Sequence, residues 1–188
     1  DARFGISGMD DILAGGLERD RVYLLEGAPG TGKTTAAMKF LLEGVRAGEA
    51  GLYITLSETE DELRGTAKSH RWSLEGVDIF ELVPPESLLD EQQQQSLLYS
   101  SDLELGETTR MIFEAVEARK PRRVVIDSLS EIRLLAQSSL RYRRQVLALK
   151  HYFAKHGATV LLLDDLTTDI NDKTVHSVAH GVVQLQEL

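Results

Sequence analysis

The sequence predicts an α/β fold in which a mostly parallel, doubly wound sheet carries helices on both faces. Short apolar runs that suit strands alternate along the chain with segments in which apolar residues recur at helical spacing. A glycine-rich turn joins the first apolar run to a helical segment, and a later apolar run ends in Asp127. This alternation is typical of parallel sheets, because each crossover helix returns the chain to the same end of the sheet.

The elements can be assigned in chain order from this spacing and from residues that start or stop helices. A short first helix is expected to begin at Ser7 or Gly8 and to end at Gly15 and Gly16. The expected strands are residues 22–25, 51–56, 77–83, 122–127, 157–165 and 182–185. The expected helices are residues 36–48, 60–70, 107–119 and 141–153.

Residues 84–106 interrupt the alternation. They begin with two prolines, which end the preceding strand, and include four consecutive glutamines at 92–95. Long connections in compact domains are usually functional or mobile. We expect an insertion or mobile loop over one face of the sheet, with room for a short helix.

Composition limits the classes of protein to which the chain can belong. Its 188 residues suffice for one domain with its own core, and 21 Lys and Arg against 30 Asp and Glu give a formal net charge of −9. This acidic balance weighs against a broad electrostatic grip on nucleic acid. The chain has no cysteine and no apolar run near the roughly 20 residues of a membrane span. We therefore expect one cytoplasmic domain over residues 1–188 that binds neither nucleic acid nor membrane.

The glycine-rich turn fits the pattern G-x-x-x-x-G-K-[ST], which is the phosphate-binding loop of nucleoside triphosphatases. Glycines let the backbone approach phosphate oxygens, successive N–H groups form an anion-binding nest, and the next helix adds its positive dipole end. Lys33 is expected to reach the β- and γ-phosphates of ATP, and the Thr34 hydroxyl to bind Mg²⁺. The predicted nucleotide-binding residues are Gly27, Ala28, Pro29, Gly30, Thr31, Gly32, Lys33, Thr34 and Thr35.

Polar residues at the ends of two other strands complete the predicted site, because ligands of open α/β sheets lie beyond the carboxyl ends of the strands. Asp127 is expected to hold Mg²⁺ together with Thr34. Ser57 and Glu58 follow the second strand, where Glu58 can orient or deprotonate an attacking water or hydroxyl. Capping of the next helix by Ser57 or Thr59 is the alternative use of this segment.

Three further groups carry weaker signals. Residues 141–144, Arg-Tyr-Arg-Arg, suit a neighbouring subunit's phosphates or, more simply, a solvated helix face or a salt-bridged interface. Asp164 and Asp165 either sense the γ-phosphate through water or only terminate their strand. His176 and His180 have the spacing of a metal pair, but a third ligand is missing from the pattern.

Together these motifs resemble the KaiC-like branch of the RecA superfamily. Residues 5–17 match its opening, Gly-Ile-x-Gly-[Leu/Met]-Asp-x-[Ile/Leu]-Leu-x-Gly-Gly-Leu, and residues 27–35 match Gly-x-Pro-Gly-Thr-Gly-Lys-Thr-Thr. Residues 57–59, 124–129 and 181–185 match further family segments. The resemblance implies a RecA-like P-loop fold and binding of ATP and Mg²⁺ in the clefts of a hexameric ring. It also implies slow ATP hydrolysis, sometimes with Ser/Thr autokinase activity.

The sequence departs from the family pattern at two places. The family usually has two adjacent glutamates after the second strand, the first resembling a general base, whereas this chain has Ser57 and Glu58. Hydrolysis is therefore expected to rest on Glu58 or to be weak. The family also continues into a Lys-x-Arg segment that reaches the next subunit's ATP, and the sequence stops at Leu188 before it. We expect an excised or truncated domain of a longer protein.

The resemblance also suggests a phosphoacceptor. Clock members of the family autophosphorylate a Ser-Thr pair shortly before the last strand, and Ser177 is the candidate by position. The expected function is a Mg²⁺-dependent ATPase that acts as a signalling or regulatory module, with a signalling protein as partner. The alternatives are a non-catalytic, ATP-switched assembly module and a RecA- or RadA-type DNA-dependent ATPase.

Overall fold

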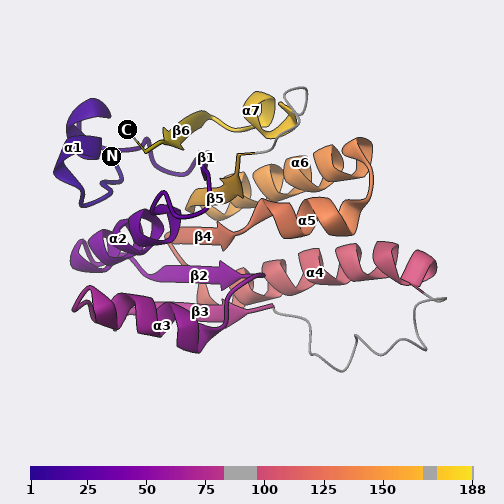
Figure 1. The fold of residues 1–188 in the computed structure, drawn as a ribbon, viewed down its shortest axis with the longest axis horizontal. Helices are drawn as coiled ribbons and strands as arrows, with labels where there is room; N and C mark the ends of the chain where they lie inside the picture. Colours follow the sequence, from indigo (N-terminus) through magenta and orange to yellow (C-terminus); the bar gives the residue numbers. More distant parts are fainter. Residues whose placement is uncertain (83–96, 167–172, 188) are drawn as a thin grey trace.

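The computed structural model describes residues 1–82, 97–166 and 173–187. The strands in this part of the chain are β1 (Val22–Gly27), β2 (Gly51–Thr55), β3 (Val77–Glu81), β4 (Arg123–Asp127), β5 (Thr159–Asp165) and β6 (Gly181–Leu185). They form one sheet in the order β3-β2-β4-β5-β1-β6, and every neighbouring pair is parallel (Figure 1). The predicted α/β fold with a parallel, RecA-like sheet is confirmed.

Helices cover both faces of the sheet. The described helices are α1 (Ser7–Ile12), α2 (Lys33–Arg46), α3 (Glu60–Ser69), α4 (Leu97–Arg119), α5 (Leu129–Ala136), α6 (Ser139–His156) and α7 (Thr174–Val178). None of these described helices is long and apolar enough to cross a membrane.

The two faces of the sheet bury two separate apolar clusters, because successive strand residues point to opposite sides. On β2, Leu52 and Ile54 belong to the cluster that includes α4, α5 and α6. Tyr53, between them, belongs to the cluster that includes α2 and α3. The central strands are therefore buried on both sides, which explains their unbroken apolar runs.

Three helices differ from the sequence prediction, and one of them is the five-residue α7, which precedes the last strand and was not expected. Helix α4 begins at Leu97, ten residues before the expected start at 107, while residues 84–96 of the expected insertion lie outside the described residues. Helix α5 was not predicted, because its eight residues allow only two turns for a helical pattern to repeat. It begins directly after β4 and buries Leu129, Ile132 and Ala136.

A buried arginine connects three segments at the amino end of the sheet. Arg123, 1% exposed at the start of β4, donates to Glu49 at 2.9 Å and to the backbone oxygens of Arg3 and Phe40 at 2.5 and 2.8 Å. Its guanidinium also lies over the Phe40 ring, 4.8 Å from the centroid. A Cβ on Gly44 would stand 2.5 Å from the Arg123 side chain, so this position of α2 suits glycine. Arg123 thus joins α2, β4 and the N-terminal segment.

We expect Arg123→Ala to lower the free energy of unfolding by about 3–5 kcal/mol, because the Arg3 and Phe40 backbone oxygens lose this buried donor and Glu49 is left with its partly exposed pair to Arg19. Urea unfolding of the variant measures this change. The control is Arg64→Ala, which breaks a partly exposed pair with Glu60 and should change stability little. Equal stability of the two variants would contradict the assignment of Arg123 as a structural anchor.

Candidate functional site

The predicted site residues meet at the carboxyl edge of the sheet. The segments after β1, β2, β4 and β5 enclose a cleft of about 400 Å³. Its lining residues are Pro29, Gly30, Gly32, Lys33, Thr34, Thr35, Ser57, Glu58, Asp127, Ser128, Ser130, Glu131 and Asp165. The structure therefore brings the phosphate-binding motif, the Ser57-Glu58 pair and Asp127 together, although they lie far apart in the sequence.

The loop between β1 and α2 is a compact turn that glycine makes possible. Thr31 closes it through its backbone N–H and its hydroxyl, which donate to the Ala28 oxygen at 3.2 and 2.7 Å. A Cβ on Gly27 would lie 2.4 Å from the Thr31 hydroxyl and 2.9 Å from the Leu185 backbone oxygen. Gly32, at the start of α2, has a φ of 90°, which side chains other than glycine rarely adopt.

The N-terminus of α2 faces this loop without a competing anion. Among the described residues, α2 receives no side-chain cap and has no acidic residue in its first turn. The first amides of a helix lack partners within the helix and carry the positive end of its dipole. The start of α2 therefore provides donors and positive potential suited to a phosphate group.

Lys33 lies inside the cleft and is largely covered by the loop. Its Nζ atom donates to the backbone oxygens of Gly27 and Ala28 at 2.6 and 3.1 Å and lies 3.0 Å from Asp165 Oδ1. All three partners are acceptors that a phosphate oxygen can replace. Lys33 is thus held at the mouth of the anion site by local partners.

The two carboxylates at the end of β5 have different surroundings. Asp164 is buried and paired with Arg133, with 2.5 Å between Oδ2 and Nη2, so it stabilises the packing of α5 on the sheet. Asp165 lies in the cleft beside Lys33. Of the two uses that the sequence left open, strand termination suits Asp164, and only Asp165 is placed to meet a ligand.

Asp127 is buried at the end of β4 and is fixed by a neighbouring hydroxyl. Tyr53 on β2 donates to Asp127 Oδ2 at 2.6 Å. Burial raises the pKa of Asp127, against the opposing effects of this hydrogen bond and of Lys33. Burial, reinforced by Asp127, also raises the pKa of Tyr53, so the phenol remains a proton donor at neutral pH.

The oxygen atoms in the cleft suit Mg²⁺. Thr34, in the first turn of α2, and Asp127, at the end of β4, both line the cleft. A hydroxyl and a carboxylate that line one cleft with room for water fit a hard cation that keeps several waters and binds few protein oxygens.

Glu58 lines the same cleft and carries a buried carboxylate oxygen. The Thr55 hydroxyl fixes the turn that carries it, accepting from the Glu58 N–H at 3.0 Å and donating to the Glu58 oxygen at 2.8 Å. The Oε2 atom is buried and has no hydrogen-bond partner among the described residues. Burial, then the charges of Asp127 and Glu62, raises the pKa of Glu58. These properties suit a group that accepts a proton.

The helix after β2 is capped by Thr59 and not by Ser57. The Thr59 hydroxyl accepts from the Glu62 N–H at 3.3 Å, and the Glu62 carboxylate accepts from the Thr59 N–H at 2.7 Å, which completes a capping box. Ser57 is exposed and lines the cleft. Neither Ser57 nor Glu58 is needed to start α3, so both are left to the site.

Sequence reasoning missed several groups in or beside the cleft. Ser130 and Glu131 lie in the first turn of α5, and the Ser130 hydroxyl is hydrogen-bonded to that of Ser128. The signal for these residues was their position directly after Asp127, at the edge where ligands bind. Tyr53 gave less signal, because a tyrosine within an apolar strand usually serves packing.

The two histidines of the proposed metal pair have separate partners. His176 Nε2 lies 2.8 Å from Glu26 Oε2, whereas His180 Nδ1 accepts from the backbone N–H of Val22 at 3.1 Å. No group of three or more His, Asp and Glu side chains suited to a metal ion occurs in the described ranges.

Ser177 lies on α7 and is exposed. Its hydroxyl accepts from Arg143 Nη1 on α6 at 3.1 Å, which gives the arginine-rich start of α6 a structural contact. Ser177 does not contribute to the lining of the described cleft.

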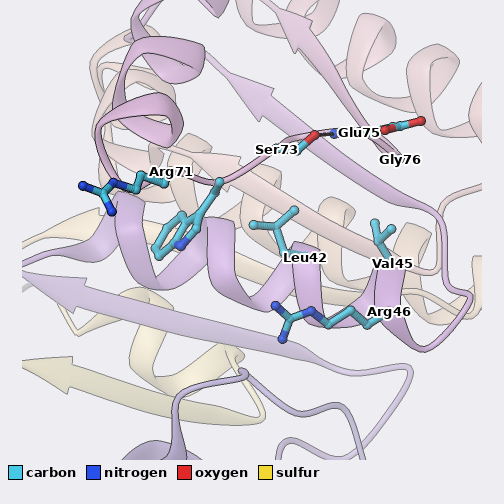
Figure 2. Close-up of a pocket in the computed structure, with 8 residues that line it drawn as sticks. Leu42, Val45, Arg46, Arg71, Ser73, Glu75 and Gly76 are labelled. Carbon is cyan, nitrogen blue, oxygen red and sulfur yellow. Dashed lines mark hydrogen bonds between the residues drawn. The ribbon is translucent and has the colours of Figure 1, made fainter.

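A second hollow, of about 550 Å³, lies beside the C-terminal half of α2 and the segment after α3 (Figure 2). Its lining residues are Leu42, Val45, Arg46, Arg71, Trp72, Ser73, Glu75 and Gly76. It shares no lining residue with the cleft at the phosphate loop.

Comparison with known proteins identifies the family. The family model described as "ATPase: KaiC" matches residues 2–187. A UPF0273 protein of Aeropyrum pernix is 30% identical over 189 residues, which cover 96% of this chain and 75% of that protein. The UPF0273 protein PH0284 of Pyrococcus horikoshii is 27% identical over 95% of this chain and 73% of its own length.

A similar match extends to a clock protein. The circadian clock protein KaiC3 of a Synechocystis species is 29% identical over 183 residues, which cover 95% of this chain and 35% of that protein. The family model spans nearly all of the chain, and the structure places the family's phosphate-binding loop at the carboxyl edge of a RecA-like sheet. The chain therefore belongs to the KaiC-like family of P-loop ATPases.

Proposed function

We propose that this protein binds ATP with Mg²⁺ in the cleft after β1 and hydrolyses it slowly, as a nucleotide-dependent regulatory module. The observation that carries the proposal is the convergence of Lys33, Thr34, Glu58 and Asp127 in one cleft at the N-terminus of α2. Membership of an ATPase family supports it. The motif and the strand ends are separate parts of the sequence, so their meeting at one point favours a common ligand.

The phosphates of ATP would bind the loop from Gly27 to Thr35 through backbone amides and the start of α2. Lys33 would exchange Asp165 and the loop carbonyls for β- and γ-phosphate oxygens. The exchange would leave Asp165 close to the γ-phosphate, where its negative charge opposes binding unless a cation or a proton compensates. The affinity for ATP should therefore depend on whether a cation or a proton offsets the charge of Asp165.

Thr34 and Asp127 would hold Mg²⁺, which when bound neutralises charge on the β- and γ-phosphates. Glu58 would orient a water molecule and accept its proton as the water oxygen attacks the γ-phosphorus. The bond between that phosphorus and the bridging oxygen breaks, and ADP leaves with the electron pair. Ser57 stands where the family commonly has a first glutamate, so one carboxylate performs this step and turnover is slow.

The second candidate function is a non-catalytic module in which ATP binding alone drives assembly or partner docking. This candidate is favoured by the serine at position 57, where the family commonly has its first glutamate, because a serine cannot act as the carboxylate base. Hexamer formation, a signalling protein partner and autophosphorylation of Ser177 stay predictions from the family resemblance. Following protein-bound label beside free phosphate during turnover of γ-labelled ATP separates kinase from ATPase activity.

We expect Lys33→Ala to weaken ATP binding about 10- to 100-fold, because hydrogen bonds to charged groups contribute about 1.5–3 kcal/mol each. Calorimetric titration with ATP and Mg²⁺ measures the change. The matched control is Lys39→Ala, which removes a cation on the same helix that lies 5.1 Å from the Trp72 ring centroid and outside the cleft. Unchanged affinity in the Lys33 variant would exclude the proposed site.

We expect Glu58→Gln to lower the rate of ATP hydrolysis by about 10²-fold or more while leaving ATP affinity similar, because glutamine cannot accept the proton. Phosphate release under saturating ATP and Mg²⁺ measures this rate. Because the pKa of Glu58 is raised, the wild-type rate should fall on acidification at a higher pH than an ordinary glutamate would give.

The matched control for this variant is Glu60→Gln, which alters a carboxylate paired with Arg64 outside the cleft. A robust wild-type rate that the Glu58 change leaves intact would remove Glu58 from the mechanism. ATP binding without any turnover in the wild type would instead favour the non-catalytic module.

A further inference from the structure

Tyr53 lies in the middle of β2, between the cleft at the carboxyl edge of the sheet and the apolar core. Its side chain is 1% exposed and packs in the cluster under α2 and α3. In the β2–β4 register Tyr53 faces Val125, and Thr55 faces Asp127. The ring therefore extends toward the carboxyl edge of the sheet, where its hydroxyl contacts Asp127.

The hydroxyl contacts one of the two residues that we assign to the cation. It donates to Asp127 Oδ2 at 2.6 Å, and Asp127 and Thr34 line the same cleft. A phenol has one proton to donate, and in this structure that proton is committed to Asp127. Within the described part of the chain, Tyr53 provides the hydrogen bond to the Asp127 carboxylate.

This contact joins two groups that come from different strands. Asp127 ends β4, the hydroxyl comes from β2, and Thr34, in the first turn of α2, lines the same cleft as Asp127. With Oδ2 engaged by the phenol, Oδ1 remains available to a ligand, and rotation of the carboxylate would break a buried hydrogen bond. Partners of this kind orient metal-binding groups, and their loss typically costs about 10- to 100-fold in metal affinity.

We propose that Tyr53 is a positioning residue that sets Asp127 in place for Mg²⁺. The inference rests on the proposed function and goes beyond it, because Tyr53 lies outside the phosphate-binding motif and is not among the residues that line the cleft. This role explains why the buried position 53 of β2 is a tyrosine, although the aromatic ring alone would satisfy the packing against α2 and α3.

The test is Tyr53→Phe, which keeps the ring and removes the hydroxyl. Equilibrium binding of a fluorescent ATP analogue is measured in EDTA and then across a series of MgCl₂ concentrations. We expect the affinity in EDTA to stay at the wild-type value, while the Mg²⁺ concentration needed for half of the metal-dependent gain rises about 10- to 100-fold. Mn²⁺ binding to the nucleotide complex, followed by electron paramagnetic resonance, should weaken by a similar factor.

Tyr23→Phe is the matched control. Tyr23 lies on β1, is buried on the same face of the sheet, and donates its hydroxyl proton to the Glu18 backbone oxygen at 2.9 Å. The Tyr23 variant loses one hydrogen-bonded hydroxyl, as the Tyr53 variant does, and Tyr23 is not among the residues that line the cleft. We expect its Mg²⁺ dependence to match that of the wild type.

Two results would overturn the inference while leaving the proposed function in place. One is a wild-type Mg²⁺ dependence in the Tyr53 variant. The other is an equal loss of affinity with and without Mg²⁺, which would show that Tyr53 supports the loop only through packing. A wild-type protein that gains no affinity for ATP on addition of Mg²⁺ would instead contradict the proposed function itself.

Discussion

The parallel register of β1, β2, β4 and β5 is the constraint on which the candidate site depends. Because all neighbouring strands run in the same direction, their carboxyl ends lie at one edge, and the segments that follow them enclose a single cleft. Arg123 joins α2 to the opposite end of the same sheet through Glu49 and the Phe40 oxygen. Helix α2, whose N-terminus faces the cleft, is thereby fixed at its other end, away from the candidate site.

The cleft concentrates negative charge. Glu58, Asp127 and Asp165 meet there, and Lys33 is the cationic side chain among the described residues that line it. Burial raises the pKa values of Glu58 and Asp127, so ionising these carboxyls is less favourable in the folded protein than in the unfolded chain. The free energy of unfolding therefore falls as the pH rises from the unfolded pKa to the folded pKa of each group. A bound cation would offset this effect. The electrostatics of the cleft thus agree with a site that binds nucleotide and metal together.

Local patterns were enough to predict the phosphate-binding loop and the strand that ends in Asp127, because each depends on spacing within a few residues. The parallel sheet could be predicted from the alternation of strands and helices along the chain. Groups whose use depends on tertiary contacts were harder to predict. Asp164 and Asp165 look alike in sequence, and only Arg133 beside one and Lys33 beside the other separate them. Tyr53 has the pattern of a core residue until β4 and α2 are placed beside it. Helix α5 was too short to show its spacing.

If the cleft is the nucleotide site, each chain binds one nucleotide at the loop after β1 together with a divalent cation. The decisive measurement is calorimetric titration of the wild-type protein with ATP, in matched buffers with and without Mg²⁺ and with ADP as competitor. We expect saturable binding of one ATP per chain, displacement by ADP and an affinity that rises with Mg²⁺. Absence of saturable binding in both buffers, with the protein folded, would exclude the site.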